Sequence, residues 1–394
     1  MEIKCSITKQ NPSFYPLILS YMKKNISISN STSKNINLHL IDLKPISDFK
    51  YTYDDTAIQS NFFDTLIQTK YNYIAINSIY LYLQDRINYN QVQNKTIGIL
   101  GDDLLGKIIY SYFKKKNHSS LVMIKNKEIS TCSIENIDIL FNTMQDIHPD
   151  DINQSPFFQK NLNCSCIYDF TFNNFNSTLI QFAKERKIKA KKGIDIEYEI
   201  ISSLLYTYFQ YTVQNNTLRQ LKYDMYNIIL IGMPSCGKST IGKSLSKILH
   251  KPCVDIDIEI EKREKKCIKD IFDSEGEFYF RQLESNISEE LSNSTGKIIS
   301  TGGGVIKNKN NIYHLKSNGL IVFIDRNFDQ LICDDASRPL SNTKENLLLM
   351  YNNRMPFYKA YADMIVQNNG TIDTTIAKIF KALSLYFSKE CYIC

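Results

Sequence analysis

Eight residues near the middle of the chain have the spacing of a phosphate-binding loop. Gly232 and Gly237 are followed by Lys238 and Ser239, which completes the pattern G-x-x-x-x-G-K-[ST]. Glycines at these positions let backbone N–H groups surround phosphate oxygens, the lysine reaches the β- and γ-phosphates, and the next hydroxyl ligates Mg²⁺. The sequence therefore predicts a nucleotide site. The residues expected to contact the nucleotide are Gly232, Pro234, Ser235, Cys236, Gly237, Lys238, Ser239 and Thr240.

Two acidic residues follow a short apolar segment that starts at Pro252. Asp255 and Asp257 stand two apart, and side chains two apart on a strand share one face. Both carboxylates can then point into the crevice at the carboxyl end of the strand, where parallel sheets bind ligands. An alternative is that an aspartate caps the helix expected over residues 258–266, which would account for one of the two. The pair indicates catalysis beside the phosphate loop.

Further residues that could hold a substrate follow along the chain. Arg281 and Glu284 are three apart, which places them on one face of a helix. Two later arginines, Arg338 and Arg354, could clamp phosphate or carboxylate, although a surface charge is the more frequent role of an arginine. The strand expected over residues 297–301 leads into a run of glycines, which we interpret as close approach of the backbone to a substrate. These glycines are Gly302, Gly303 and Gly304.

Two apolar segments are each expected to form a strand that leads into a loop and then a helix. Residues 226–231 form a short, unbroken, β-branched run before a helix expected over 238–249, and residues 96–101 do the same before 104–114. Such runs are typical of strands buried on both faces of a parallel sheet. The sequence thus predicts an α/β fold with two such βα units. Polar stretches separate three expected domains, at residues 1–94, 95–214 and 222–394.

The composition narrows the class of protein. The 394 residues carry a net charge of +6 from scattered lysines, so we expect no nucleic-acid partner. No apolar stretch reaches the roughly 18 residues of a membrane helix, and no signal-peptide pattern opens the chain, so we expect no membrane partner and a cytoplasmic location. Four of the 14 glycines precede Gly232 and ten lie from there on, which points to chemistry in the C-terminal part.

The ordered motifs resemble those of shikimate kinase over residues 226–394. The set comprises the phosphate loop, Asp255-x-Asp257, Phe280-Arg281-x-x-Glu284, the triple glycine, Arg338-Pro339-Leu340 and Arg354-x-Pro356-x-Tyr358. The resemblance implies a P-loop NTPase-type kinase domain that transfers the γ-phosphoryl of MgATP to the 3-hydroxyl of shikimate, in chorismate and aromatic amino-acid biosynthesis. One departure is that residues 331–337 lack the arginine that many family members stack on adenine.

The same resemblance implies a role for each residue. Lys238, Asp257 and Arg338 would be catalytic, with Asp257 as the base that holds the attacking hydroxyl and Arg338 closing over the transferring phosphate. Ser239 and Asp255 would place the magnesium ion. The residues implied to bind shikimate are Asp257, Arg281, Gly302, Gly303, Gly304 and Arg354.

The first 214 residues resemble a degenerate shikimate dehydrogenase, which has two α/β lobes, one of them Rossmann-type. Asp103 stands where the dinucleotide fingerprint has its central glycine, and the segment that supplies the family's catalytic lysine has no counterpart. We therefore expect a catalytically inactive module that could still serve as a scaffold, a binding lobe or the contact surface of a homo-oligomer. The similar segments are residues 75–79, 99–106, 138–143, 167–172 and 178–180.

Three alternatives stay open from the sequence. The chain could be bifunctional, making shikimate with NADP as cofactor and then phosphorylating it. The N-terminal module could bind a metabolite or a protein and thereby control the kinase. The kinase fold could instead act on gluconate or a nucleoside monophosphate, although the paired aspartates and the triple glycine argue against this.

Overall fold

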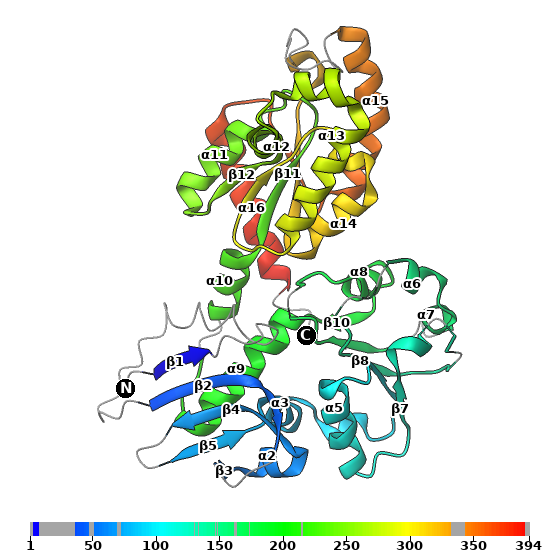
Figure 1. Ribbon diagram of the computed structural model, residues 1–394, viewed down its shortest axis with the longest axis vertical. Helices are drawn as coiled ribbons and strands as arrows, with labels where there is room; N and C mark the ends of the chain where they lie inside the picture. The colour runs from blue at the N-terminus through cyan, green and yellow to red at the C-terminus, as the bar shows by residue number, and fades with distance from the viewer. Residues whose placement is uncertain are drawn as a thin grey trace. The chain divides into compact units, whose positions relative to one another are not determined.

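The chain divides into two compact units, unit 1 over Met1–Leu221 and unit 2 over Lys222–Tyr392. Figure 1 shows the fold of each unit in a computed structural model. The structure describes residues 3–7, 36–46, 51–68, 72–129, 131–132, 134–145, 147, 149–160, 164–172, 174–213, 216–331 and 343–390. The predicted domain limits at residues 94, 95, 214 and 222 stay predictions.

The first half of unit 1 is a mixed sheet. Its strand order is β1-β2-β4-β5-β3, with parallel pairs at the two edges and antiparallel pairs between them. A small core under this sheet joins Ala57, Phe63, Leu66 and Ala75. The elements are β1 (Ile3–Ile7), β2 (Ile36–Pro45), β3 (Thr52–Tyr53), α2 (Asp55–Ser60), β4 (Phe62–Gln68), β5 (Tyr73–Ile76), α3 (Ser78–Arg86) and α4 (Tyr89–Val92).

The second half of unit 1 is a parallel sheet with the order β10-β9-β8-β6-β7. Strand β6 lies between β7 and β8, so the strand order reverses there, as at the ligand crevice of doubly wound sheets. The elements are β6 (Ile97–Leu100), α5 (Leu104–Lys115), β7 (Leu121–Ile124), η1 (Asn126–Glu128), β8 (Ile139–Asn142), α6 (Pro149–Gln154), α7 (Pro156–Lys160), β9 (Cys166–Asp169), α8 (Thr178–Glu185), β10 (Lys189–Lys191) and α9 (Gly193–Phe209). Helix α10 (Asn216–Met225) follows and contains the limit between the two units.

Helix α9 joins the two halves of unit 1. The Tyr208 hydroxyl donates to the carboxylate of Asp54, which caps α2, and the Ser203 hydroxyl donates to Asp85 on α3 at 2.5 Å. Both contacts cross from the second half to the first. These polar contacts along α9 are among those that hold the two halves of unit 1 together.

Unit 2 is a five-stranded parallel sheet with the order β12-β13-β11-β14-β15. Its three central strands are buried on both faces, as their apolar runs predict. The strands are β11 (Asn227–Ile231), β12 (Cys253–Asp255), β13 (Ile298–Ser300), β14 (Gly319–Asp325) and β15 (Met364–Gln367). The helices are α11 (Lys238–Leu249), α12 (Ile256–Glu264), α13 (Ile268–Ser292), η2 (Val305–Lys307), α14 (Lys309–Ser317), η3 (Phe328–Gln330), α15 (Lys344–Tyr361) and α16 (Ile372–Glu390).

The α/β fold predicted from the two apolar runs is confirmed. Residues 97–100 and 227–231 are parallel strands, and each is followed by a loop and a helix, α5 or α11. In unit 2 the loops after β11, β12 and β13 leave adjacent strands at the same edge of the sheet. The fold therefore brings the phosphate loop, the aspartates and the triple glycine together.

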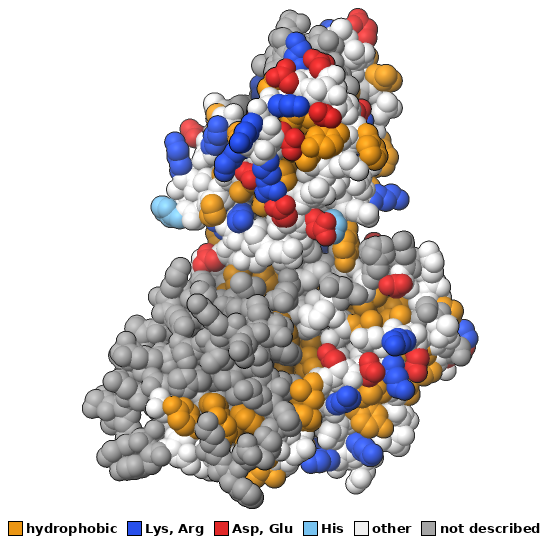
Figure 2. All heavy atoms as spheres, in the orientation of Figure 1, with side chains coloured by type: hydrophobic (Ala, Val, Ile, Leu, Met, Phe, Trp, Pro, Cys, Tyr) orange, Lys and Arg blue, Asp and Glu red, His pale blue; other side chains and the backbone are white. Residues whose placement is uncertain are grey.

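The surface of unit 2 carries charges of both signs. On the face drawn in Figure 2, basic and acidic side chains of unit 2 lie interspersed rather than in a continuous basic area. In the part of the chain that the structure describes, no helix has both the length and the apolar character needed to cross a membrane.

Candidate active site

A cavity of about 310 Å³ lies at the carboxyl ends of β11, β12 and β13. It is lined by residues from the phosphate loop, α12, α13, the glycine turn and α15. Most of the predicted site residues meet here, namely Pro234, Lys238, Ser239, Asp255, Asp257, Arg281, Gly302, Gly303, Gly304 and Arg354. Arg338 lies outside the described residues, so its predicted role is carried by the sequence alone.

The phosphate loop joins β11 to α11 as its sequence predicts. Gly237 has φ +97 and caps α11, whose first residue is Lys238. The Lys238 ammonium is buried and donates to the backbone oxygens of Gly232 at 3.0 Å and Met233 at 2.9 Å, so it lies across the loop. The other predicted loop residues, Ser235 and Cys236, lie between β11 and α11, and Thr240 is the exposed third residue of α11.

Asn368, at the end of β15, is a residue that no sequence pattern singled out. Its buried amide donates to the backbone oxygen of Cys236 at 2.8 Å and accepts from the Thr375 hydroxyl at 2.7 Å. A side chain on Gly237 would meet this amide at 2.8 Å. Asn368 therefore fixes the shape of the phosphate loop from a distant part of the sequence.

The geometric prediction for Asp255 and Asp257 is wrong in one respect. Strand β12 ends at Asp255, and Asp257 lies in the first turn of α12, so the two do not share a strand face. Asp255 is the helix cap, accepting from the backbone N–H of Asp257 at 3.1 Å. The strand has only three residues, and it ends where the capping side chain accepts from the backbone N–H groups that open the helix. Both carboxylates nevertheless line the cavity.

Asp255 also faces the phosphate loop. The Ser239 hydroxyl donates to Asp255 Oδ2 at 2.6 Å. A hydroxyl and a carboxylate oxygen side by side are hard oxygen ligands, which Mg²⁺ prefers, and Mg²⁺ commonly takes only one or two protein ligands beside phosphates and waters. The donor set thus fits a magnesium ion held between α11 and α12.

Asp257, Glu284 and Gly302 crowd one wall of the cavity. A methyl group on Gly302 would lie 2.8 Å from Asp257 Oδ1 and 2.9 Å from Glu284 Oε1. Glu284 is fully buried, and this burial raises the pKa of its carboxyl to about 7, against the opposing effect of the Arg281 guanidinium. The neighbouring Asp257 raises that pKa further. The glycine therefore leaves room for two carboxyl groups that share one small region.

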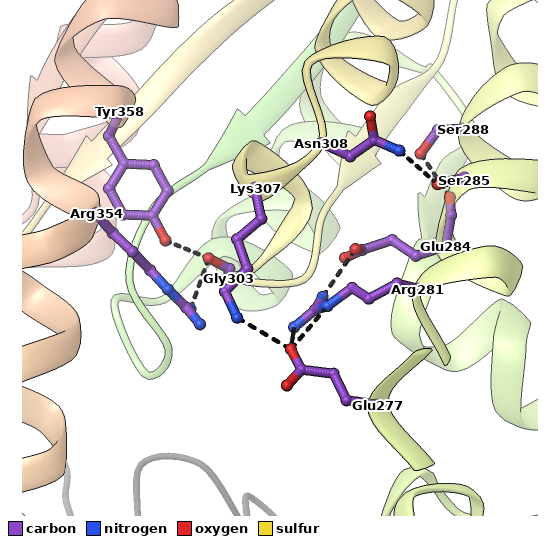
Figure 3. Close-up of polar contacts among 10 residues, drawn as sticks. All are labelled: Glu277, Arg281, Glu284, Ser285, Ser288, Gly303, Lys307, Asn308, Arg354 and Tyr358. Atoms are coloured by element: carbon purple, nitrogen blue, oxygen red, sulfur yellow. Dashed lines mark hydrogen bonds and ion pairs between the residues drawn. The ribbon is translucent and has the colours of Figure 1, made fainter. Parts of the chain in front are cut away.

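Arg281 is oriented by acidic side chains on its own helix. Figure 3 shows its guanidinium between Glu284, to which it donates at 2.8 Å, and Glu277, to which it donates at 3.1 and 3.2 Å. Lys307, just after the glycine turn, also donates to Glu277 at 3.0 Å. A methyl group on Gly304 would lie 2.4 Å from this guanidinium. Arg281 is thus held against the glycine turn.

Arg354 and Tyr358 hold the glycine turn from the opposite side. The Arg354 guanidinium donates to the Gly303 backbone oxygen at 2.8 Å, and the Tyr358 hydroxyl donates to the same oxygen at 2.5 Å (Figure 3). Burial raises the pKa of Tyr358, whose ring stacks on Phe323 of β14. Tyr358 stood in the motif that the sequence singled out, yet only the structure shows its contact with the turn.

The dinucleotide-type turn of unit 1 is arranged differently. Asp103 caps α5 by accepting from the backbone N–H of Gly106 at 2.8 Å, and the same Oδ1 accepts from the Thr143 hydroxyl at 2.8 Å. Helix N-termini attract anions because their first N–H groups are unpaired. Here the chain's own carboxylate occupies that position.

Comparisons with known proteins agree with the site in unit 2. A family model described as shikimate kinase matches residues 234–384. The shikimate kinase of Clostridium botulinum (strain Alaska E43 / Type E3) is 44% identical over 159 residues, which are 96% of that protein and 40% of this chain. The chain belongs to the shikimate kinase family. The solved shikimate kinase of Aquifex aeolicus is 35% identical and matches 96% of its length and 40% of this chain, with a TM-score of 0.37.

The shikimate kinase part thus lies within unit 2, and the resemblance stated from its ordered motifs is confirmed. A similar solved structure for the remainder is shikimate 5-dehydrogenase from Thermus thermophilus, in complex with NADP(H) and shikimate. That structure is 10% identical, is matched over 77% of its length and 47% of this chain, and has a TM-score of 0.37. A likeness of this size assigns unit 1 no activity.

Proposed function

We propose that unit 2 transfers the γ-phosphoryl group of MgATP to the 3-hydroxyl of shikimate, giving shikimate 3-phosphate and ADP. One observation carries the proposal: the phosphate loop and the Asp257 carboxylate face the same cavity, which Arg281, Arg354 and the glycine turn also line. Phosphate-binding and carboxylate-binding groups therefore meet on either side of a single space.

At the phosphate end, the residues would act mainly by position and charge. Lys238 and the N-terminus of α11 would hold the β- and γ-phosphates, because the ammonium and the helix N–H groups lie at one edge of the loop. Ser239 and Asp255 would hold Mg²⁺. When bound, the ion would neutralise charge on the β- and γ-phosphate oxygens. We assign Arg338 to the same end by resemblance.

At the acceptor end, Arg281 and Arg354 would bind the shikimate carboxylate, since guanidinium groups match carboxylates in geometry and charge. The Asp257 carboxylate would accept the proton of the attacking hydroxyl and orient its oxygen towards the γ-phosphoryl. Because phosphoryl transfer needs little covalent help from the protein, such placement supplies most of the catalysis. The backbone N–H groups of residues 302–304 would border the ring hydroxyls.

The proposal is tested by measuring ADP release with shikimate, gluconate, CMP and AMP as separate acceptors. Release with shikimate alone is expected, and release only with another acceptor would refute the assignment. Asp257→Asn and Arg281→Ala should each lower kcat or kcat/KM on the order of 10²-fold. Matched controls are Asp273→Asn and Arg263→Ala, whose side chains are exposed on α13 and α12 and should leave the rate unchanged.

For unit 1 we propose a module without dehydrogenase activity. Support comes from Asp103, whose carboxylate caps the helix end that a pyrophosphate would need. The second candidate is a bifunctional enzyme with NADP-linked shikimate dehydrogenase activity. Shikimate-dependent NADPH formation, measured in the same preparation, would establish that candidate and refute ours. We also propose that the chain self-associates through unit 1, which sedimentation analysis tests. A cytoplasmic location is a further proposal, and cell fractionation tests it.

A further inference from the structure

A second cavity of unit 2, of about 700 Å³, lies between the segment just after the glycine turn and helix α15. It is lined by residues within 306–309 and by one face of α15 between residues 346 and 361, and we call it the α15 cavity. Met350 and Arg354 line both this cavity and the active-site cavity, so the two spaces are neighbours. The volume lies within the range of small-molecule sites, which is roughly 300–1,000 Å³.

The α15 cavity exposes large apolar side chains to solvent. Leu349 is 63% exposed and Phe357 is 47% exposed, and both line the cavity. The rings of Phe357 and Tyr361, which also lines it, stack with their centroids 6.2 Å apart and 29° between their planes. Covering such side chains with a flat apolar group is favourable, because apolar surface leaves water and the aromatic rings find a partner. The cavity therefore suits a ligand that contains a ring.

The α15 cavity also carries positive charge. Lys307, Lys309 and Arg354 line it, and none of the described residues that line it is acidic. Lys309 is exposed, has no ion pair with a described residue, and is the first residue of α14, whose first turn contains no acidic side chain. Because a helix N-terminus is itself positive, a lysine there is unfavourable and a nearby anion is favourable. The charge of the cavity thus favours an anionic ligand.

We propose that the α15 cavity binds an aromatic carboxylate, with its ring against Phe357 and Tyr361 and its carboxylate beside Lys307 and Lys309. An ammonium can donate to a carboxylate and match its charge, and such charge-assisted hydrogen bonds are the strong ones. An amino acid fits less well, because its own ammonium would find no acidic partner among the described residues that line the cavity.

Lys307 connects the α15 cavity to the acceptor end of the active site. Its ammonium donates to Glu277 Oε1 at 3.0 Å, and the same oxygen accepts from the Arg281 guanidinium at 3.1 Å (Figure 3). A carboxylate in the cavity would draw Lys307 away from Glu277, which would then pair with Arg281 alone. If unit 2 acts as proposed above, Arg281 is then less available to shikimate. The ligand therefore raises the KM for shikimate without entering the active-site cavity.

Binding is measured by calorimetry on the full chain without ATP or shikimate, so this measurement does not depend on the proposed function. The probe is 2-naphthoate, and 2-naphthamide has the same ring system without the charge. The variants Lys309→Ala and Phe357→Ala each remove one part of the cavity. Their matched controls are Lys247→Ala on α11 and Phe278→Ala on α13, whose exposed side chains line neither cavity.

The dissociation constant of 2-naphthoate should rise on the order of tenfold in Lys309→Ala and in Phe357→Ala and stay unchanged in both controls. The amide should bind the wild type more weakly by a similar factor. Arg281→Ala should retain binding, and its loss there would place the probe in the active-site cavity and overturn the proposal. No binding at millimolar concentration would also overturn it and would leave this face to another occupant, such as an acidic protein segment.

Kinase assays test the connection through Lys307. With 2-naphthoate the wild-type KM for shikimate should rise, and Lys309→Ala should need on the order of tenfold more of the probe for the same rise. An unchanged KM at saturating probe would refute the connection. If the chain failed to phosphorylate shikimate, the function proposed above would be wrong, and the calorimetry would still decide whether the α15 cavity binds the carboxylate.

Discussion

Glu284 makes the stability of unit 2 depend on pH in a direction that can be measured. Its carboxyl is fully buried, and its pKa rises from 4.5 to about 7. Between these two values the folded chain keeps a proton that the unfolded chain releases, so the contribution to the free energy of unfolding is full below about pH 4.5 and is lost as the pH rises through about 7. This rise in the pKa of Glu284 corresponds to about 3 kcal/mol in the free energy of unfolding.

The substitution Glu284→Gln removes the ionisation and keeps the shape of the side chain. A glutamine oxygen can still accept from Arg281, which now donates at 2.8 Å. We therefore expect the variant to become more stable than the wild type as the pH rises. The difference between variant and wild type should increase by up to about 3 kcal/mol from about pH 5 to about pH 8.5.

Hydrogen exchange in the full chain gives the required measurement within unit 2. Peptides from β11 and β13 report opening of the sheet core, and comparing variant with wild type at the same pH cancels the intrinsic exchange rates. Glu289→Gln, an exposed change on the same helix α13, is the control and should show no pH-dependent difference. If Glu284→Gln gave a constant difference across the pH range, the carboxylate would be ionised throughout, and pairing with Arg281 would outweigh burial.

Three further substitutions test contacts of the turns. Gly304→Ala would place a methyl group 2.4 Å from the Arg281 guanidinium; the KM for shikimate should rise roughly tenfold or more with little change for ATP, and an equal rise for both would contradict this. Tyr358→Phe removes one donor to Gly303 and should lower stability by about 1 kcal/mol in urea unfolding, whereas no loss would mean that Arg354 alone suffices. Asp103→Ala should destabilise unit 1 by about 1 kcal/mol by calorimetry, and an unchanged stability would contradict the capping role of this carboxylate.

The features that the sequence could predict are those fixed within a few residues. The phosphate loop needs a strand, two glycines and a helix in immediate succession, and the structure has β11, Gly232, Gly237 and α11 in that order. The apolar runs were equally local, because a strand that is buried on both faces needs apolar side chains at every position. Because the strands of this sheet run parallel, the loops that follow them lie at one edge of the sheet.

The features that could not be predicted depend on backbone oxygens and on chain segments far apart. Asn368 acts on the oxygen of Cys236, 132 residues away, and Tyr358 acts on the oxygen of Gly303, 55 residues away. A backbone oxygen has no residue type, so no pattern marks it in the sequence. The predicted position of Asp257 on a strand was wrong for another reason. A strand or a helix over these residues would each place a carboxylate near the site, and the sequence did not show that the short β12 ends before Asp257.

The glycines of the two units show why a retained glycine is not evidence of a ligand. In unit 2 the side chains that a methyl group on Gly302 or Gly304 would meet are Asp257, Glu284 and Arg281, so these glycines make room for the residues of the site. In unit 1 a methyl group on Gly101 would meet the Thr143 hydroxyl at 2.2 Å, and one on Gly106 would meet the oxygen of Gly101 at 2.3 Å. Packing alone thus requires glycine at both positions of this turn, whether or not a ligand binds there.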